Sequence, residues 1–170
     1  MDLASASQGR TLAPAHEGET TMHIGQICTN EATCCTRDET VQGAALLMRR
    51  QHVGDVIVVD RFDGASVPVG IVTDRDIVIS VIAPGLDPVS LQVGDIMSED
   101  LLTARDTDDV YETIERMRLR GIRRVPVVDA RGSLAGIVSA DDLLEFLAEE
   151  MGELSRISPW QQAHERRARQ

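Results

Sequence analysis

The sequence predicts an α/β fold in which two tandem β-α-β-β-α units pack with pseudo-twofold symmetry around a central cleft. The first observation is an internal repeat: residues 24–60 align with residues 93–129, and residues 70–76 align with residues 136–142 after a short insertion in the first copy. The second is the same succession of strand and helix patterns in both copies. A unit of about 60 residues buries only roughly 60% of its unfolded surface. Each copy should therefore cover the apolar face of the other, and a cleft is expected at the seam.

A short extended segment and an amphipathic helix open each copy. The extended segments are residues 32–35 and 101–104. In the second copy Asp108 and Asp109 should open the helix, and Gly121 should end it, because glycine readily adopts the left-handed backbone of helix ends. His52 holds the equivalent position in the first copy. Apolar residues recur at helical spacing in the two helices: Val110, Ile114 and Met117, and Val41, Ala44, Ala45 and Met48.

Two strands and a second helix complete each copy. Asp- and Gly-rich turns separate paired β-branched runs, a pattern typical of hairpins, at residues 56–59 and 67–72 and at residues 125–128 and 134–138. A second helix should follow Thr73 and Ser139, and the last one should extend from Asp141 to Leu154. The predicted division is a disordered tail (1–21), a first unit (22–83), a linker (84–92), a second unit (93–151) and a C-terminal tail (152–170).

The charge and the cysteines limit the classes of function. A formal net charge of -11 argues against nonspecific binding to nucleic acid or to an anionic membrane, since both need a positive surface. The sequence has no run of 18 apolar residues and no secretory signal at its start, so neither a membrane span nor export is predicted. The clustered Cys28, Cys34 and Cys35 suit a reducing, cytoplasmic environment better than a disulfide framework.

One motif occurs in both copies where the last strand meets the second helix. It reads Gly-x-x-Thr-x-x-Asp from Gly70 to Asp76, and Gly-x-x-Ser-x-x-Asp from Gly136 to Asp142. The hydroxyl and the carboxylate fall on the same side of the helix start, near unpaired backbone N–H groups, which suits a ribose phosphate. The same spacing also forms a capping box, which only closes the start of a helix. The spacing alone leaves both interpretations open.

With these motifs the doubled unit resembles a pair of cystathionine β-synthase (CBS) domains, the Bateman module, in the form of a stand-alone bacterial-type protein. The resemblance covers about residues 24–150 and rests on the motif above, on the run 122–129 and on the openings 27–29 and 96–98. It implies a regulatory module without enzymatic activity or a prosthetic group. An adenine nucleotide (AMP, ADP or ATP, with NAD as a further candidate) would bind in the cleft and signal to a protein partner of unknown identity. A disc-like homodimer is also implied.

The resemblance further implies which residues form the site. Asp76 and Asp142 would hold ribose hydroxyls, with Thr73 and Ser139 near the ribose or phosphate. Residues beside the middle strand of each sheet would border the base and the phosphates: Asp55, Val56, Ile57, Arg124, Val125 and Pro126. The opposite wall would be lined by Thr33, Cys34, Leu102 and Thr103.

The two copies differ beside the middle strand, where the second has Arg123 and Arg124 and the first has Gly54 and Asp55. A guanidinium grips phosphate through charge-assisted bidentate bonds, whereas a carboxylate repels it. Two unequal sites are therefore predicted, with the stronger phosphate contact at Arg123 or Arg124. The alternative is that both arginines lie on a solvated surface. All seventeen basic residues are arginine, so the choice of arginine over lysine carries little weight.

Other chemistry has weaker support. His23 and the cysteines lack the spacing of a structural zinc site, and no nucleophile–base or paired-acid pattern indicates catalysis. Two alternatives stay open: an interaction homodimer with a vestigial cleft, and a thiol redox sensor that uses Cys34 or Cys35, whose side chains should point to opposite faces of a strand. The basic segment around Trp160 is either a frayed, solvated helix end or a contact with a second subunit or partner.

Overall fold

Two three-stranded sheets form the frame of the molecule, one from each repeat. The computed structural model describes residues 22–168, and the predicted N-terminal tail lies outside the described residues. The first repeat forms β1 (Cys34–Cys35), α1 (Val41–Gln51), β2 (Asp55–Phe62), β3 (Ala65–Thr73), α2 (Asp74–Ile77) and the π-helical segment η2 (Val78–Ile82). The second forms β4 (Ala104–Arg105), α3 (Val110–Arg120), β5 (Arg124–Val128), β6 (Leu134–Ser139) and α4 (Ala140–Ala168). Short 3-10 helices precede the first strand of each sheet: η1 (Ile24–Gln26) and η3 (Val93–Asp95).

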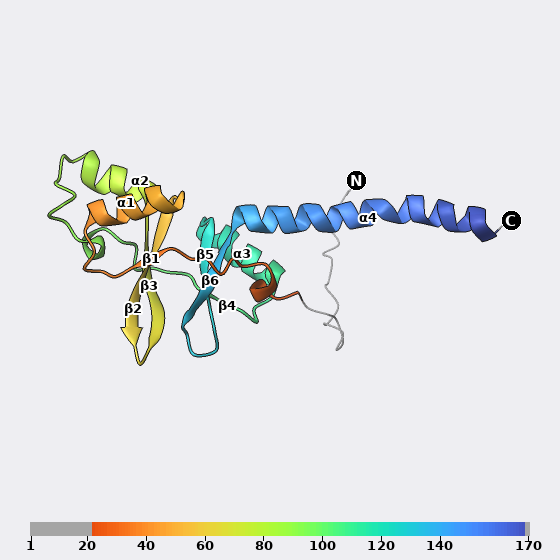
Figure 1. Cartoon of the computed structure of the whole chain (residues 1–170), viewed down its shortest axis with the longest axis horizontal. Coiled ribbons are helices and arrows are strands. Elements are labelled where there is room, and N and C mark those ends of the chain that lie inside the picture. The colour runs from red at the N-terminus through yellow and green to blue at the C-terminus, as the bar shows by residue number, and fades with distance from the viewer. Residues whose placement is uncertain (1–21, 169–170) are drawn as a thin grey trace, which may run out of the picture.

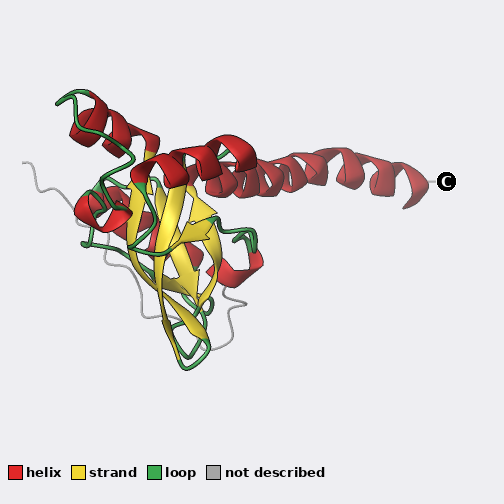
Figure 2. Ribbon diagram, turned by 60° about the vertical axis from the view of Figure 1, so that its left-hand side comes forward, coloured by secondary structure: helices red, strands yellow, loops and turns green. Residues whose placement is uncertain are grey.

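The sheets have the same topology and lie side by side. The strand order is β1-β2-β3 and β4-β5-β6, with the first pair of each sheet parallel and the second pair an antiparallel hairpin. The sheets contact each other through β3 and β6. The helices α1, α2 and α4 lie at the end opposite the hairpin turns, and Figure 2 shows the strands of both sheets grouped beneath them (Figure 1). The predicted α/β architecture is confirmed.

The boundaries of the first helix in each repeat have local causes. The side chains of Thr40 and Asp109 each accept a hydrogen bond from the backbone N–H three residues on, both at 2.9 Å, and so cap α1 and α3. Both helices end on a left-handed residue, His52 (φ 56°) and Gly121 (φ 65°). The expected helix end at Gly121 is confirmed. His52 adopts the same left-handed backbone conformation, which is sterically less favourable for a residue that has a Cβ.

Each repeat contributes a crossover segment, residues 22–29 or 91–98, to the opposite unit. Ile24 N donates to the carbonyl of Asp108 at 2.9 Å, and the equivalent Val93 N donates to that of Glu39 at 2.8 Å. Both isoleucine and valine are completely buried. The two units are therefore not independent blocks joined by a linker, because the start of each one packs against the other.

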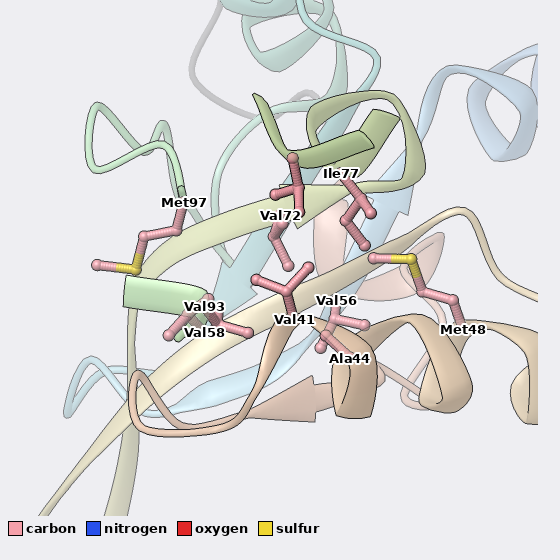
Figure 3. Packing of buried hydrophobic residues seen from close by; sticks show 10 residues of the cluster. Val41, Ala44, Met48, Val56, Val58, Val72, Ile77, Val93 and Met97 are labelled. Carbon is pink, nitrogen blue, oxygen red and sulfur yellow. The ribbon is translucent and has the colours of Figure 1, made fainter. Parts of the chain in front are cut away.

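Two hydrophobic cores result. The first core combines residues of its own repeat with Val93 and Met97 from the second crossover segment (Figure 3). Its other buried members are Val41, Ala44, Met48, Val56, Val58, Val72, Ile77 and Val81. The second core likewise includes Ile24 from the first crossover segment, together with Ala104, Val110, Met117, Val125, Val127, Val138 and Leu143. The apolar stripes predicted for α1 and α3 thus face these cores.

The last helix is longer than the sequence predicts. α4 continues beyond Leu154 to Ala168, through the segment expected to be a C-terminal tail. The apolar stripe predicted for this helix stops near Leu154 and the residues after it are basic, so the segment from residue 152 onward was expected to be a tail. Leu143 and Phe146 pack on the second core, after which α4 projects away from the body (Figure 1). No described helix is both long and apolar enough to cross a membrane.

Candidate functional site

The repeated motif forms a closed capping box in both units. Ser139 N and the Ser139 hydroxyl both donate to Asp142 Oδ2 at 2.7 Å, and Asp142 N donates to Ser139 Oγ at 3.1 Å. Thr73 and Asp76 make the same three contacts at 2.9, 2.7 and 3.2 Å. The capping interpretation is therefore confirmed. Because both bonds to each carboxylate use Oδ2, Oδ1 remains as an acceptor for a ligand hydroxyl.

The glycine of the motif is required by a crossover segment. Thr29 exchanges backbone hydrogen bonds with Ile137, at 2.9 and 3.0 Å, directly beside Gly136. A Cβ on Gly136 would collide with the carbonyl oxygen of Thr29. In the first unit a Cβ on Gly70 would lie 2.7 Å from the Met97 sulfur. Glycine at these positions lets the opposite repeat approach the start of the box closely.

A cavity of about 260 Å³ lies beside the box of the second unit. The box and the end of β6 form one part of its lining, and the first crossover segment with the residues after it forms another. The loop before β2 and the first residues of β2 and β5 form the rest. Five predicted site residues line it: Thr33, Asp55, Arg124, Ser139 and Asp142. Both repeats therefore contribute to one cavity at the seam.

The other predicted site residues lie elsewhere. Four of them are buried, so that their backbone alone could face a ligand: Val56, Ile57, Val125 and Pro126. Cys34 and Thr103 line separate hollows, and Leu102 packs against the second core. Thr73 and Asp76 form the equivalent box of the first unit.

Several lining residues were missed by sequence reasoning: Thr29, Glu31, His52, Val53 and Ile137. Ile137 belongs to the repeated motif and faces the cavity because it pairs with Thr29. His52 reaches the cavity from the end of α1, where only its role in the helix end was apparent. Glu31 lies just after the first crossover segment, and the repeat pattern contains no signal that this segment packs on the opposite unit.

Arg124 reaches across the seam to a carboxylate. Its Nε lies 2.8 Å from Oδ1 of Asp55, the residue at the equivalent position of the first repeat. Asp55 is only 7% exposed. Burial raises the pKa of the Asp55 carboxyl above its ordinary value, Arg124 opposes this rise, and Asp74 adds to it. Arg123 lies on the exposed surface, 3.0 Å from Asp141, so Arg124 is the arginine of this pair that lines the cavity.

Two of the three cysteines are poor nucleophiles. Burial raises the pKa of the Cys35 thiol to about 11, with Glu39 and Cys34 adding to the rise. Burial also raises the pKa of Cys28. Such thiols are almost entirely protonated near neutral pH. Cys34 is exposed and Cys35 packs against the first core, as expected for neighbours on a strand. Within residues 22–168, no group of three or more His, Cys, Asp or Glu side chains is placed to hold a metal ion.

Known proteins resemble the chain along both repeats. The family model for the CBS domain matches residues 24–82 and 93–149. An uncharacterized protein of Methanopyrus kandleri is 35% identical over 122 residues, which cover 72% of this chain and 61% of that protein. The chain spans about three fifths of the length of the first curated relatives that it matches.

Two solved structures share the fold. Hypoxic response protein I of Mycobacterium tuberculosis, with two coordinated zinc ions, is 30% identical, with a TM-score of 0.64 and coverage of 73% of this chain and 98% of that one. A CBS domain protein from Pyrobaculum aerophilum complexed with AMP is 27% identical, with a TM-score of 0.65 and coverage of 75% and 99%.

Proposed function

The chain belongs to the CBS domain family, and on this basis we propose that it is a regulatory module that binds an adenine nucleotide in the cavity between its repeats. The observation that carries the proposal is the cavity itself, in which the Asp142 carboxylate, the start of α4 and the Arg124 guanidinium lie together. These groups suit a ribose hydroxyl and a phosphate. The related protein from Pyrobaculum aerophilum was crystallised with AMP. We propose a regulatory role, as a homodimer that signals to a partner protein.

The charges around the cavity favour a ligand with few phosphates. Three carboxylates line it, those of Glu31, Asp55 and Asp142, against the single guanidinium of Arg124. One phosphate can be matched by Arg124, whereas the further charges of ADP and ATP would meet carboxylates at close range. The volume of about 260 Å³ also lies just below the range of about 300–1,000 Å³ that is usual for ligand pockets. We therefore expect AMP to bind more tightly than ADP, and ADP more tightly than ATP or NAD.

The Asp55–Arg124 pair would couple the ligand to the seam. Because the two residues come from different repeats, a phosphate on Arg124 competes with an ion pair that joins the units. A ligand that binds more tightly when Arg124 is released from Asp55 shifts the population toward the conformation in which this ion pair is broken and the two repeats are placed differently relative to each other. A partner protein that contacts both repeats would then distinguish the free from the bound state.

Calorimetry and thermal unfolding with AMP, ADP, ATP, NAD and S-adenosylmethionine test the proposal. A ligand that binds only the folded chain raises the unfolding free energy by about 2.7 kcal/mol at a hundredfold excess over its Kd. AMP should therefore raise the Tm clearly, and ATP should do so less at equal concentration. The absence of a response to all five compounds would refute nucleotide binding, and would favour an interaction homodimer with a vestigial cleft.

Asp142→Ala separates the binding role of the box from its capping role. The variant loses a cap and a carboxylate of the cavity, so we expect a stability loss of about 1 kcal/mol and AMP affinity at least tenfold lower. Asp109→Ala is the matched control, because Asp109 caps α3 and does not line the cavity. It should lose similar stability and keep its AMP affinity. Asp76→Ala should weaken AMP binding less than Asp142→Ala if the two sites are unequal.

A further inference from the structure

His52 ends α1 in a backbone conformation that favours glycine. Its φ is 56°, and the equivalent Gly121 ends α3 with a φ of 65°. A Cβ makes this left-handed region sterically unfavourable, and glycine avoids the clash. A Cβ on Gly121 would meet no atom within 4 Å, so the surroundings leave room for a side chain there as well. The helix end alone therefore explains a glycine at position 52 better than a histidine.

The side chain of His52 lines the cavity beside the box of the second unit. Among the described residues of that lining, His52 and Arg124 are the only basic side chains, and they stand against three carboxylates. Within residues 22–168, the imidazole of His52 forms no hydrogen bond and no ion pair. An imidazole has one N–H donor when it is neutral and two when it is protonated. The lining therefore includes a donor that the described part of the chain does not use.

The other basic group of the cavity is already engaged. Arg124 Nε lies 2.8 Å from Asp55 Oδ1, so a phosphate that approaches this guanidinium shares it with a carboxylate. The loop that carries His52 lies against the same guanidinium, because a Cβ on Gly54 would be 3.9 Å from Arg124 Nη2. The loop and the guanidinium therefore border the same part of the cavity, and a phosphate bound there needs a second donor.

We propose that His52 donates a hydrogen bond to the phosphate of the nucleotide and, together with Arg124, makes the cavity select a nucleoside monophosphate over the unphosphorylated nucleoside. This inference rests on the proposed nucleotide binding and adds a specificity-determining residue to it. The contact with the ligand accounts for a side chain at a position where glycine would fit the backbone better. The second repeat retains glycine at position 121, which does not line this cavity.

Titration calorimetry of the full chain with AMP and with adenosine tests the assignment. Two substitutions remove the imidazole: His52→Gly copies the helix end of the second repeat, and His52→Asn introduces a shorter, uncharged side chain that tolerates the left-handed backbone. The parent chain should bind AMP more tightly than adenosine. Both variants should bind AMP at least about tenfold more weakly, as expected for the loss of a hydrogen bond to a charged group. Their affinity for adenosine should stay the same, because adenosine has no phosphate.

Thermal unfolding without ligand separates the role in binding from a role in the fold. The Tm of His52→Gly should be no lower than that of the parent, since glycine fits the left-handed end of α1. A loss of AMP affinity in a chain of equal stability then reports the missing contact rather than a damaged fold. His23→Asn is the matched control for His52→Asn, because His23 is exposed and does not line the cavity. It should keep its affinity for both compounds.

The comparison of AMP with adenosine also defines how the proposal fails. AMP affinity that is unchanged in both His52 variants would show that the imidazole does not contact the phosphate. An equal loss of AMP and adenosine affinity would assign His52 to the nucleoside or to the shape of the cavity, and would likewise overturn the proposal. If the parent chain binds neither compound, the proposed nucleotide binding itself is wrong, and this inference is wrong with it.

Discussion

At the scale of single residues, the buried negative charge of Asp55 lowers the stability of the ligand-free chain. The ion pair with Arg124 offsets this loss only in part. Its pKa is raised by burial, so its contribution to the unfolding free energy is present below the unfolded value of 3.8 and is lost as the pH rises through the folded pKa. Asp55→Asn removes this loss. We expect the variant to gain stability relative to the parent as the pH rises above the unfolded value of 3.8, as measured by urea unfolding at several pH values. A parent chain that gains stability over the variant with rising pH would contradict this assignment.

The same substitution leaves Arg124 without its carboxylate partner. Because a phosphate no longer competes with Asp55 for the guanidinium, Asp55→Asn should also bind AMP more tightly, whereas Arg124→Gln should bind it more weakly. Titration calorimetry of the two variants beside the parent gives the comparison. This pair also shows a limit of sequence reasoning. The alignment of the repeats shows that Asp55 and Arg124 differ at equivalent positions. It does not show that the two residues touch, because an alignment contains no information on how the two units are placed in space.

At the scale of elements, two glycines should respond in opposite directions to alanine. Gly136→Ala forces the β6 strand away from the Thr29 carbonyl and should destabilise the chain by about 1–3 kcal/mol. Gly152→Ala adds a methyl group where no atom lies within 4 Å, in the interior of α4, and should stabilise that helix by up to about 1 kcal/mol. Thermal and denaturant unfolding of the two variants would measure both effects. Equal effects would mean that the crossover segment does not limit space at Gly136.

Element boundaries were predictable wherever a local cause sets them. Asp109 and Gly121 bound α3 through a side-chain cap and a left-handed residue, and both features are legible in the sequence. The end of α4 was not, because the prediction followed the apolar stripe, and the helix continues beyond the last residue of that stripe. The π-helical segment η2 after α2 also has no counterpart in the second repeat, although both helices start from the same box.

At the scale of the whole molecule, the repeat predicted two units and a seam but not how they are joined. Sequence periodicity reports which face of an element is apolar, and it does not report which unit covers that face. Ile24 and Val93 occupy equivalent positions in the repeat. The same apolar pattern would fit packing in the core of their own unit or in that of the opposite unit. The crossover segments decide the site as well, because Thr29 and Glu31 line the cavity only through this exchange.

The exchange predicts that the chain unfolds as one cooperative body. Ile24 is completely buried in the second core although it lies at the start of the first repeat. Ile24→Ala should lower the unfolding free energy by about 2–5 kcal/mol, and urea unfolding should remain a single transition by far-UV circular dichroism and by hydrogen exchange at amides of β2 and β5. Ile79→Ala, at a position that is 53% exposed, is the control and should change stability by less than about 0.5 kcal/mol. If β5 loses its protection well before β2 in the Ile24→Ala chain, the two cores unfold separately and the crossover segments do not bind the repeats into one unit.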